Sequence, residues 1–253
     1  MLKATFTFDY TTPIVCTAIH NGHYLRKEIA DNTTLPDMDR LREEDPFTGY
    51  FTEFCPNRIV VNTSRFEVDL NRPQNRSVYQ NPEDCWGLAL REEPLPDNMV
   101  QKSLSEFDDF YRRAKIHFDE IITKFDKLIV LDIHSYNHHR LGPDAEYDNP
   151  EYNPEIILGT NNMPDENLPF VERFKDNLTT LDFEGRSIDC RINIKFPGGH
   201  FSRWIHHTYG EKAIAVAFEF KKTFLDEWSG ELDFIKQQKL RNLLIKGLNL
   251  TLN

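Results

Sequence analysis

The sequence predicts an α/β fold, a three-layer α/β/α domain built around a mostly parallel mixed sheet. Residues 128–134 form an apolar run rich in branched residues, which is typical of a parallel strand covered on both faces. A long amphipathic pattern at residues 100–125 leads directly into this run, in the helix-then-strand order of a wound sheet. The chain has 253 residues and no linker or low-complexity stretch, so we expect a single domain over residues 1–253.

The composition argues against several classes of protein. A hydrophobic fraction of 39%, with 19 Phe, is enough for a sizeable core. The formal net charge of −11 argues against nucleic acid or an anionic membrane as a partner, because both are bound through clustered Lys and Arg. The four cysteines are far apart, which indicates neither a structural zinc site nor a disulfide framework. No run resembles a signal peptide or spans a bilayer, so we expect a cytoplasmic protein.

Residues 13–22 form the first informative strand, an apolar run that ends in His20 before an Asn-Gly turn signal. The charged stretch at residues 42–46 follows, with three carboxylates in a row directly before a proline. Taken alone, such a cluster is usually a solvated loop or the start of a helix.

A short strand at residues 58–62 leads into a segment that carries Arg65, Asn71 and Arg72. The planar guanidinium of arginine matches a carboxylate in two parallel hydrogen bonds, so this segment is suited to hold a carboxylate ligand. An internal salt bridge of either arginine with Asp69 is the alternative.

The strand at residues 128–134 carries polar side chains toward its carboxyl end. With a period of two, Asp132 and His134 point to the same side, which leaves an imidazole at the strand tip with a carboxylate behind it. This pattern indicates a metal ligand supported by a second carboxylate. The alternative is a hydrogen-bonded histidine at the edge of a core. Residues 136–155 have the composition of a long loop over a site.

The later elements end in a strand that carries a lone acid. They are a strand at 155–159, a helix at 170–181, a strand at 191–196 broken by Pro197-Gly198-Gly199, a strand at 212–220 and a helix at 231–250. Glycines at a strand end allow close approach of backbone to a ligand. Glu219 closes an otherwise apolar strand, and burying a lone carboxylate is costly unless something uses it. A pair with Lys221 or Lys222 is the alternative.

Three separate strands thus end in His20, His134 and Glu219. Two histidines and a carboxylate with an open position are the ligand pattern of a catalytic zinc, and a further carboxylate can take a proton from its water. The sequence therefore favours a metal-dependent hydrolytic site over coincidence.

An ordered set of motifs extends this interpretation from His20 to about Phe220. It comprises His20-Asn21-Gly22, Glu44-Asp45, Ser64-Arg65, Asp69-Leu70-Asn71-Arg72-Pro73, Asp132-Ile133-His134-Ser135, Gly198-Gly199 with Arg203, and Phe218-Glu219. The set resembles the N-formylglutamate amidohydrolase family, which is related to the zinc carboxypeptidases. The resemblance implies a zinc-carboxypeptidase-like (phosphorylase/hydrolase-like) fold. The chain departs from the family at Ile19-His20-Asn21-Gly22, where Pro-His-Ser-Gly or Pro-His-Ala-Gly is common, and at Ser202, where Thr is common.

The resemblance also implies roles for these residues. One zinc ion is held by His20, His134 and an acid from the Glu44-Asp45 pair, of which Asp45 is preferred and Glu44 is nearly as good. The remaining implied roles are general base for Glu219, carbonyl polarisation for Arg65, a grip on the substrate α-carboxylate for Asn71 and Arg72, and a substrate contact for Arg203.

The implied reaction is hydrolysis of a small N-acyl amino acid, foremost N-formyl-L-glutamate to formate and glutamate. A carboxypeptidase-like enzyme acting on a short peptide or another N-acyl amino acid would use the same metal set. A non-catalytic binding protein on this scaffold is the third interpretation. The sequence leaves the oligomeric state open.

Overall fold

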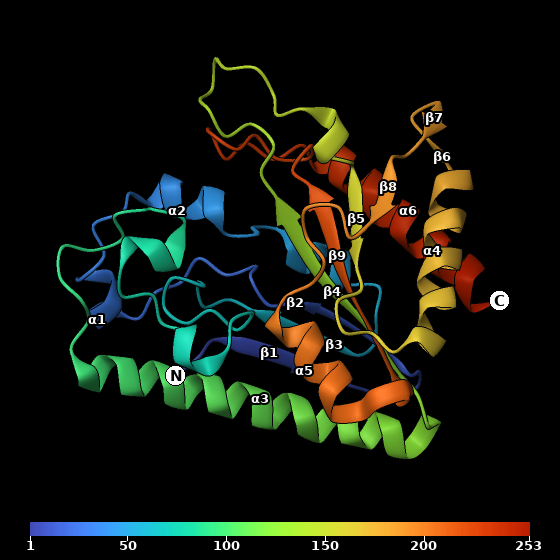
Figure 1. Cartoon of the computed structure of the whole chain (residues 1–253), viewed down its shortest axis with the longest axis horizontal. Coiled ribbons are helices and arrows are strands. Elements are labelled where there is room, and N and C mark those ends of the chain that lie inside the picture. The colour runs from blue at the N-terminus through green and yellow to red at the C-terminus, as the bar shows by residue number, and fades with distance from the viewer.

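A mixed sheet of seven strands runs through the centre of the molecule (Figure 1). The computed structural model describes all residues, 1–253. In spatial order the strands are β1 (Ala4–Thr7), β3 (Arg58–Val61), β2 (Ile14–Ala18), β4 (Leu128–Tyr136), β9 (Ala213–Lys221), β5 (Ile156–Gly159) and β8 (Cys190–Ile192). The four strands β3, β2, β4 and β9 are parallel, and so are β5 and β8. Only the β1–β3 and β5–β9 pairs are antiparallel, so the predicted mostly parallel mixed sheet is confirmed.

Helices cover both faces of this sheet. On one face, α3 (Asp97–Phe125) and α5 (His200–Tyr209) bury Phe110, Phe118 and Phe201 in the same apolar cluster as Val130 of β4. On the other face, α4 (Leu168–Thr180) and α6 (Phe234–Leu252) share a second cluster with Leu131. Successive residues of β4 therefore belong to opposite cores, as the period of two requires. The three predicted layers are confirmed.

The remaining elements are short. They are α1 (Lys27–Ala30), α2 (Asp37–Glu43), the hairpin of β6 (Asp182–Phe183) and β7 (Arg186–Ser187), and the 3₁₀ turns η1 (Thr48–Thr52), η2 (Gln74–Arg76), η3 (Pro82–Cys85), η4 (Pro150–Tyr152), η5 (Asp165–Asn167) and η6 (Gly210–Lys212). No helix of the structure has both the length and the apolar character needed to cross a bilayer.

Most predicted elements lie within a few residues of their expected positions. All nine residues of β4 are buried, as expected for a strand covered on both faces. The strand predicted at 191–196 is wrong in its extent, because β8 ends at Ile192. Asn193 and Lys195 then take positive φ angles of 58° and 65°, which a continuing strand does not allow.

Candidate metal centre

The carboxyl ends of three adjacent parallel strands bring His20, His134 and Glu219 together. β4 and β9 pair in a register that sets the Cα of His134 directly beside that of Glu219. β2 lies on the other side of β4, and the chain reaches His20 two residues beyond its end. Parallel strands finish at one edge of a sheet, so residues far apart in sequence meet there.

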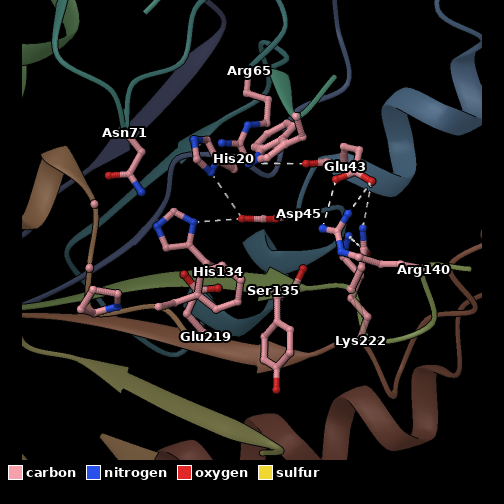
Figure 2. Close-up of a pocket in the computed structure, with 17 residues that line it drawn as sticks. His20, Glu43, Asp45, Arg65, Asn71, His134, Ser135, Arg140, Glu219 and Lys222 are labelled. Atoms are coloured by element: carbon pink, nitrogen blue, oxygen red, sulfur yellow. Dashed lines mark hydrogen bonds and ion pairs between the residues drawn. The ribbon is translucent and has the colours of Figure 1, made fainter. Parts of the chain in front are cut away.

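Asp45 joins the two histidines to form a buried cluster of possible metal ligands (Figure 2). Its Oδ2 atom lies 2.9 Å from Nδ1 of His134 and 3.5 Å from Nδ1 of His20. One ligand atom from each of the three residues lies within 4.8 Å of the other two. Two imidazole nitrogens and one carboxylate oxygen thus face a single point.

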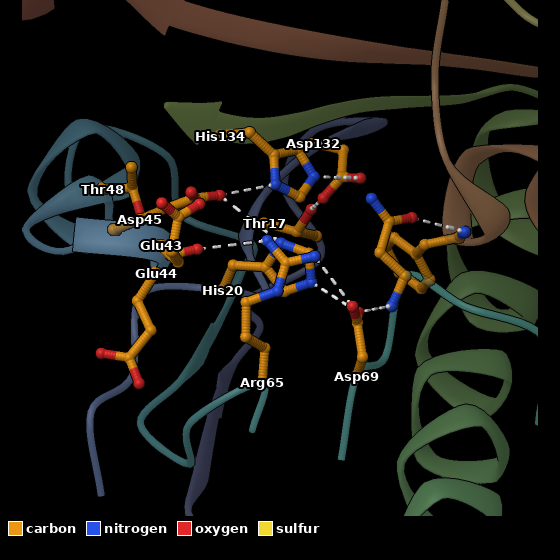
Figure 3. Close-up of polar contacts among 12 residues, drawn as sticks. Thr17, His20, Glu43, Glu44, Asp45, Thr48, Arg65, Asp69, Asp132 and His134 are labelled. Atoms are coloured by element: carbon orange, nitrogen blue, oxygen red, sulfur yellow. Dashed lines mark hydrogen bonds and ion pairs between the residues drawn. The ribbon is translucent and has the colours of Figure 1, made fainter. Parts of the chain in front are cut away.

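Two further carboxylates fix the far sides of the two histidine rings (Figure 3). Nε2 of His134 lies 2.9 Å from Oδ2 of Asp132, and Nε2 of His20 lies 2.7 Å from Oδ1 of Asp69. Thr17 donates its hydroxyl to the other oxygen of Asp132 at 2.7 Å. Carboxylates in this position orient a ligating histidine and increase the basicity of its free nitrogen.

The electrostatics of the cluster follow from these contacts. Burial alone would raise the pKa of Asp45, but hydrogen bonds from His134 and His20 outweigh it and hold this pKa well below its usual range. Burial opposes the protonation of His134, but the carboxylates of Asp132 and Asp45 raise its pKa well above the usual value. The cluster therefore favours a positive charge between its carboxylates.

Glu219 borders the same cavity, and its side chain makes no hydrogen bond or ion pair. The expected alternative partners are engaged elsewhere: Lys221 donates to the carbonyl of Asn153 at 2.8 Å, and Lys222 donates to carbonyl oxygens described below. Burial raises the pKa of Glu219 to about 7, although the nearby His134 lowers it. A carboxyl group with a pKa near neutrality is suited to accept and return a proton.

Glu219→Gln is expected to stabilise the metal-free protein at pH 8. Folding raises the pKa of this carboxyl group from 4.5 to about 7, so its ionised form opposes folding above pH 7. The gain should be about 3 kcal/mol at pH 8 and below about 1 kcal/mol at pH 5, because the folded group is protonated at pH 5 and that pH lies only slightly above the unfolded pKa of 4.5. Urea unfolding at the two pH values measures it.

Glu92→Gln is the matched control, because Glu92 is exposed and has no partner. Its effect should stay within about 0.5 kcal/mol at both pH values. Equal stabilities of wild type and Glu219→Gln at pH 8 would mean that the folded protein does not raise this pKa.

The structure does not bring Glu44 to the cluster. Its carboxylate is buried and turned away, with Oε2 2.6 Å from Nδ1 of His23 and Oε1 in contact with the hydroxyl of Ser64. Arg40 lies 3.4 Å from Oε1. Of the two acids that the sequence left open, only Asp45 faces the histidines.

A cavity of about 200 Å³ opens at this cluster. It is lined by His20, Glu43, Asp45, Arg65, Asn71, Trp86, His134, Ser135, Tyr136, Asn137, Arg140, Phe196, Pro197, Gly198, Gly199, Glu219 and Lys222. Most of these side chains are polar, and two lining residues, Glu43 and Arg140, form an ion pair at 3.2 Å. The cavity is suited to a small polar ligand.

Two of the predicted substrate-contacting residues line this cavity. The guanidinium of Arg65 donates to Asp69 at 2.8 Å and lies 4.7 Å from the centre of the Trp86 ring. Arg65 therefore forms the internal salt bridge that the sequence left open and lines the cavity as well. Asn71 accepts a hydrogen bond from the backbone of Phe201 at 3.0 Å. A Cβ at position 199 would lie 2.1 Å from Oδ1 of Asn71, so a larger residue there would displace this side chain.

Arg72 and Arg203 do not line the cavity. Nε of Arg72 lies 3.8 Å from Asp69, and its Nη2 donates to the carbonyl of Asp84 at 3.4 Å. Arg203 lies on α5, half-buried, and its side chain makes no hydrogen bond or ion pair. The structure thus brings together His20, Asp45, Arg65, Asn71, His134 and Glu219, and leaves Glu44, Arg72 and Arg203 apart.

Comparison with known proteins agrees with this geometry. The sequence pattern of the N-formylglutamate amidohydrolase family matches residues 12–225. The chain belongs to this family. No curated protein sequence matches it.

Two solved structures share the fold of this N-formylglutamate amidohydrolase family member at low sequence identity. The N-formylglutamate amidohydrolase from Ralstonia eutropha JMP134 is 13% identical, with a TM-score of 0.75 over 99% of this chain and 96% of that one. A gene product of Agrobacterium tumefaciens is 17% identical, with a TM-score of 0.63 over 100% and 96%. A metallo-carboxypeptidase from Burkholderia cenocepacia reaches a TM-score of 0.36 at 10% identity, over 99% and 64%.

Family membership supports an amidohydrolase, and the donor set of the cluster fits a divalent metal ion. Two imidazole nitrogens with one carboxylate oxygen are the protein ligands of many catalytic zinc sites. His20 and His134 present Nδ1 to the same point because carboxylates hold both Nε2 atoms. The family member can therefore hold an ion between His20, Asp45 and His134.

Sequence reasoning missed several residues of the site. The sequence indicates Asp69 as a possible partner for arginine and as part of a motif, but it does not show that Asp69 also holds His20. Glu43 and Arg140 also line the cavity. Their positions in an acidic cluster and in the 136–155 loop are the only sequence features that could have indicated this. The sequence indicates Lys222 only as a possible partner of Glu219.

Proposed function

We propose that the chain is a zinc-dependent hydrolase of a small N-acyl amino acid, with N-formyl-L-glutamate as the first candidate substrate. The main support for this proposal is that His20, Asp45 and His134 converge beside the unpaired carboxylate of Glu219. Family membership supports the amide as the bond that is cleaved. The cavity of about 200 Å³ is smaller than the roughly 300–1,000 Å³ of drug-sized sites. This size favours an acyl amino acid over a peptide.

The mechanism assigns one task to each side chain. An ion held by His20, His134 and Asp45 would act as a Lewis acid, lowering the pKa of a water and polarising the acyl oxygen. Glu219 accepts the proton of the attacking water and delivers it to the leaving nitrogen. Arg65 donates to the developing oxyanion, and losing one such donor typically costs about 10²–10³ in rate. Addition of water and cleavage of the C–N bond yield a carboxylic acid and the free amino acid.

Release of formate from N-formyl-L-glutamate tests this proposal. The zinc-loaded protein should release formate, and a sample treated with a chelator should not. Protein that binds one zinc ion but releases no formate would keep the hydrolase site and exclude this substrate. A panel of N-acyl amino acids and dipeptides would then identify the acyl group. Activity that survives complete removal of metal would contradict the proposal.

Arg72→Ala is expected to raise KM about tenfold and to leave kcat within a few-fold, because a grip on the α-carboxylate is uniform binding. This role requires Arg72 to move from its contacts with Asp69 and Asp84 toward the cavity. Steady-state kinetics measures the split. Arg76→Ala is the control, since Arg76 is exposed and unpaired in the following turn. An unchanged KM would leave Arg72 with its structural contacts alone.

A further inference from the structure

Asp45 is the one member of the metal cluster that neither lies on a strand nor closely follows one. It follows α2 and its single-residue C-cap, in a segment without regular structure. The backbone N–H of Asp45 donates to the carbonyl of His20 at 3.0 Å, and the carbonyl of Asp45 accepts from the hydroxyl of Thr48 at 2.7 Å. The chain just before Asp45 needs a separate anchor, because a carboxylate ligand must be held within a fraction of an ångström.

Lys222 provides contacts at that position. It follows β9 directly, and its backbone N–H donates to the carbonyl of Tyr136 at 3.0 Å, so it is tied to the sheet. Its side chain is 2% exposed. Nζ donates to the carbonyl of Arg42 at 2.6 Å, to the carbonyl of Glu44 at 2.7 Å and to the side-chain oxygen of Asn137 at 2.8 Å (Figure 2 shows its approach to the cavity). All three ammonium protons are used on neutral oxygens.

The sequence just after α2 explains why the carbonyl of Arg42 needs a donor from another part of the chain. The carbonyl of Arg42 would normally accept from the residue four positions later, which is Pro46 and has no N–H. An ammonium group at a helix C-terminus also interacts favourably with the helix dipole. Burial lowers the pKa of Lys222, but the nearby carboxylates of Asp45, Glu227 and Glu43 oppose this and favour the charged form.

We infer that Lys222 is a positioning residue of the metal site: it fixes the backbone of residues 42–44 to the sheet and thereby sets the carboxylate of Asp45 against His20 and His134. The inference rests on the proposed metal-dependent function. It assigns Lys222 no contact with the reacting atoms. Loss of the ammonium should free the Asp45 segment while both histidines stay in place on their carboxylates.

Zinc affinity measured by competition with a chromophoric chelator tests this inference without any substrate. Lys222→Met should weaken zinc binding about 10–100-fold, the usual cost of losing a group that orients a ligand. Formate release should fall at limiting zinc and recover to within several-fold at saturating zinc. If Lys222→Met does not fold, Lys222→Gln replaces it in the test. Glutamine keeps polar donors but is too short to reach both carbonyls, so it should show the same loss of zinc affinity.

Lys221→Met is the matched control. Lys221 is the adjacent residue, and its ammonium donates to the carbonyl of Asn153, away from the Asp45 segment. Its zinc affinity should stay within about twofold of wild type. A lower melting temperature of Lys222→Met with unchanged zinc affinity would overturn the inference, because the lysine would then only stabilise the fold. Wild-type protein that binds no divalent ion would overturn the metal site itself, which is a separate result.

Discussion

Glu219→Gln is expected to lower kcat by about 10²–10⁴-fold, the usual contribution of a general base, while the protein stays folded and binds metal. Three carboxylates line the cavity, and two of them are engaged: Asp45 with the histidines and Glu43 with Arg140. Glu219 alone is unpaired, and burial raises its pKa to about 7. Glutamine keeps the shape of this side chain but cannot accept a proton from water.

The stability change expected for this substitution makes the experiment sharp. Glutamine at position 219 should make the metal-free protein more stable at pH 8, so a loss of turnover cannot come from unfolding. Formate release at saturating zinc, with bound zinc measured by elemental analysis, separates proton transfer from metal binding. Glu92→Gln should retain wild-type kcat. A Glu219→Gln enzyme that keeps more than about a tenth of kcat would remove Glu219 from proton transfer.

The fold could be predicted where burial alone decides the local structure. β4 is covered on both faces, and the apolar run at residues 128–134 predicts this burial without further information. The strand predicted at 191–196 extends too far because its last residues turn through positive φ at Asn193 and Lys195. Neither asparagine nor lysine marks such a turn as clearly as glycine does.

The site could be predicted where regular strands deliver its residues. His134 and Glu219 share a register position on adjacent parallel strands, so their meeting follows from the sheet. The preference for Asp45 over Glu44 came from the family resemblance and not from the local sequence, because the orientation of this irregular segment depends on distant contacts with His20 and Lys222. From the sequence, only a salt bridge with a nearby arginine could be suggested for Asp69, whereas in the folded chain its carboxylate has several partners.

Asp69→Asn is expected to lower the free energy of unfolding by about 3–5 kcal/mol, as for a buried ion pair that loses one partner. Asp69 is fully buried and accepts at both oxygens: Oδ1 from His20 at 2.7 Å and from the N–H of Asn71 at 2.8 Å, and Oδ2 from Arg65 at 2.8 Å and from Tyr79. An amide has only one accepting oxygen, so its NH₂ group faces donors in either orientation.

The consequence should reach the metal site through His20. Without a carboxylate on Nε2, this ring can carry its proton on Nδ1, which removes a metal ligand, so zinc affinity should fall about 10–100-fold as well. Urea unfolding and chelator competition measure the two effects. Asp189→Asn is the control, because Asp189 pairs with Arg191 at 2.7 Å with both side chains 39% exposed. Breaking this surface pair should cost about 1 kcal/mol or less. Equal losses of stability for the two variants would show that the buried contacts of Asp69 contribute no more than a surface pair. A stable Asp69→Asn protein with weakened zinc binding would show that Asp69 only orients His20.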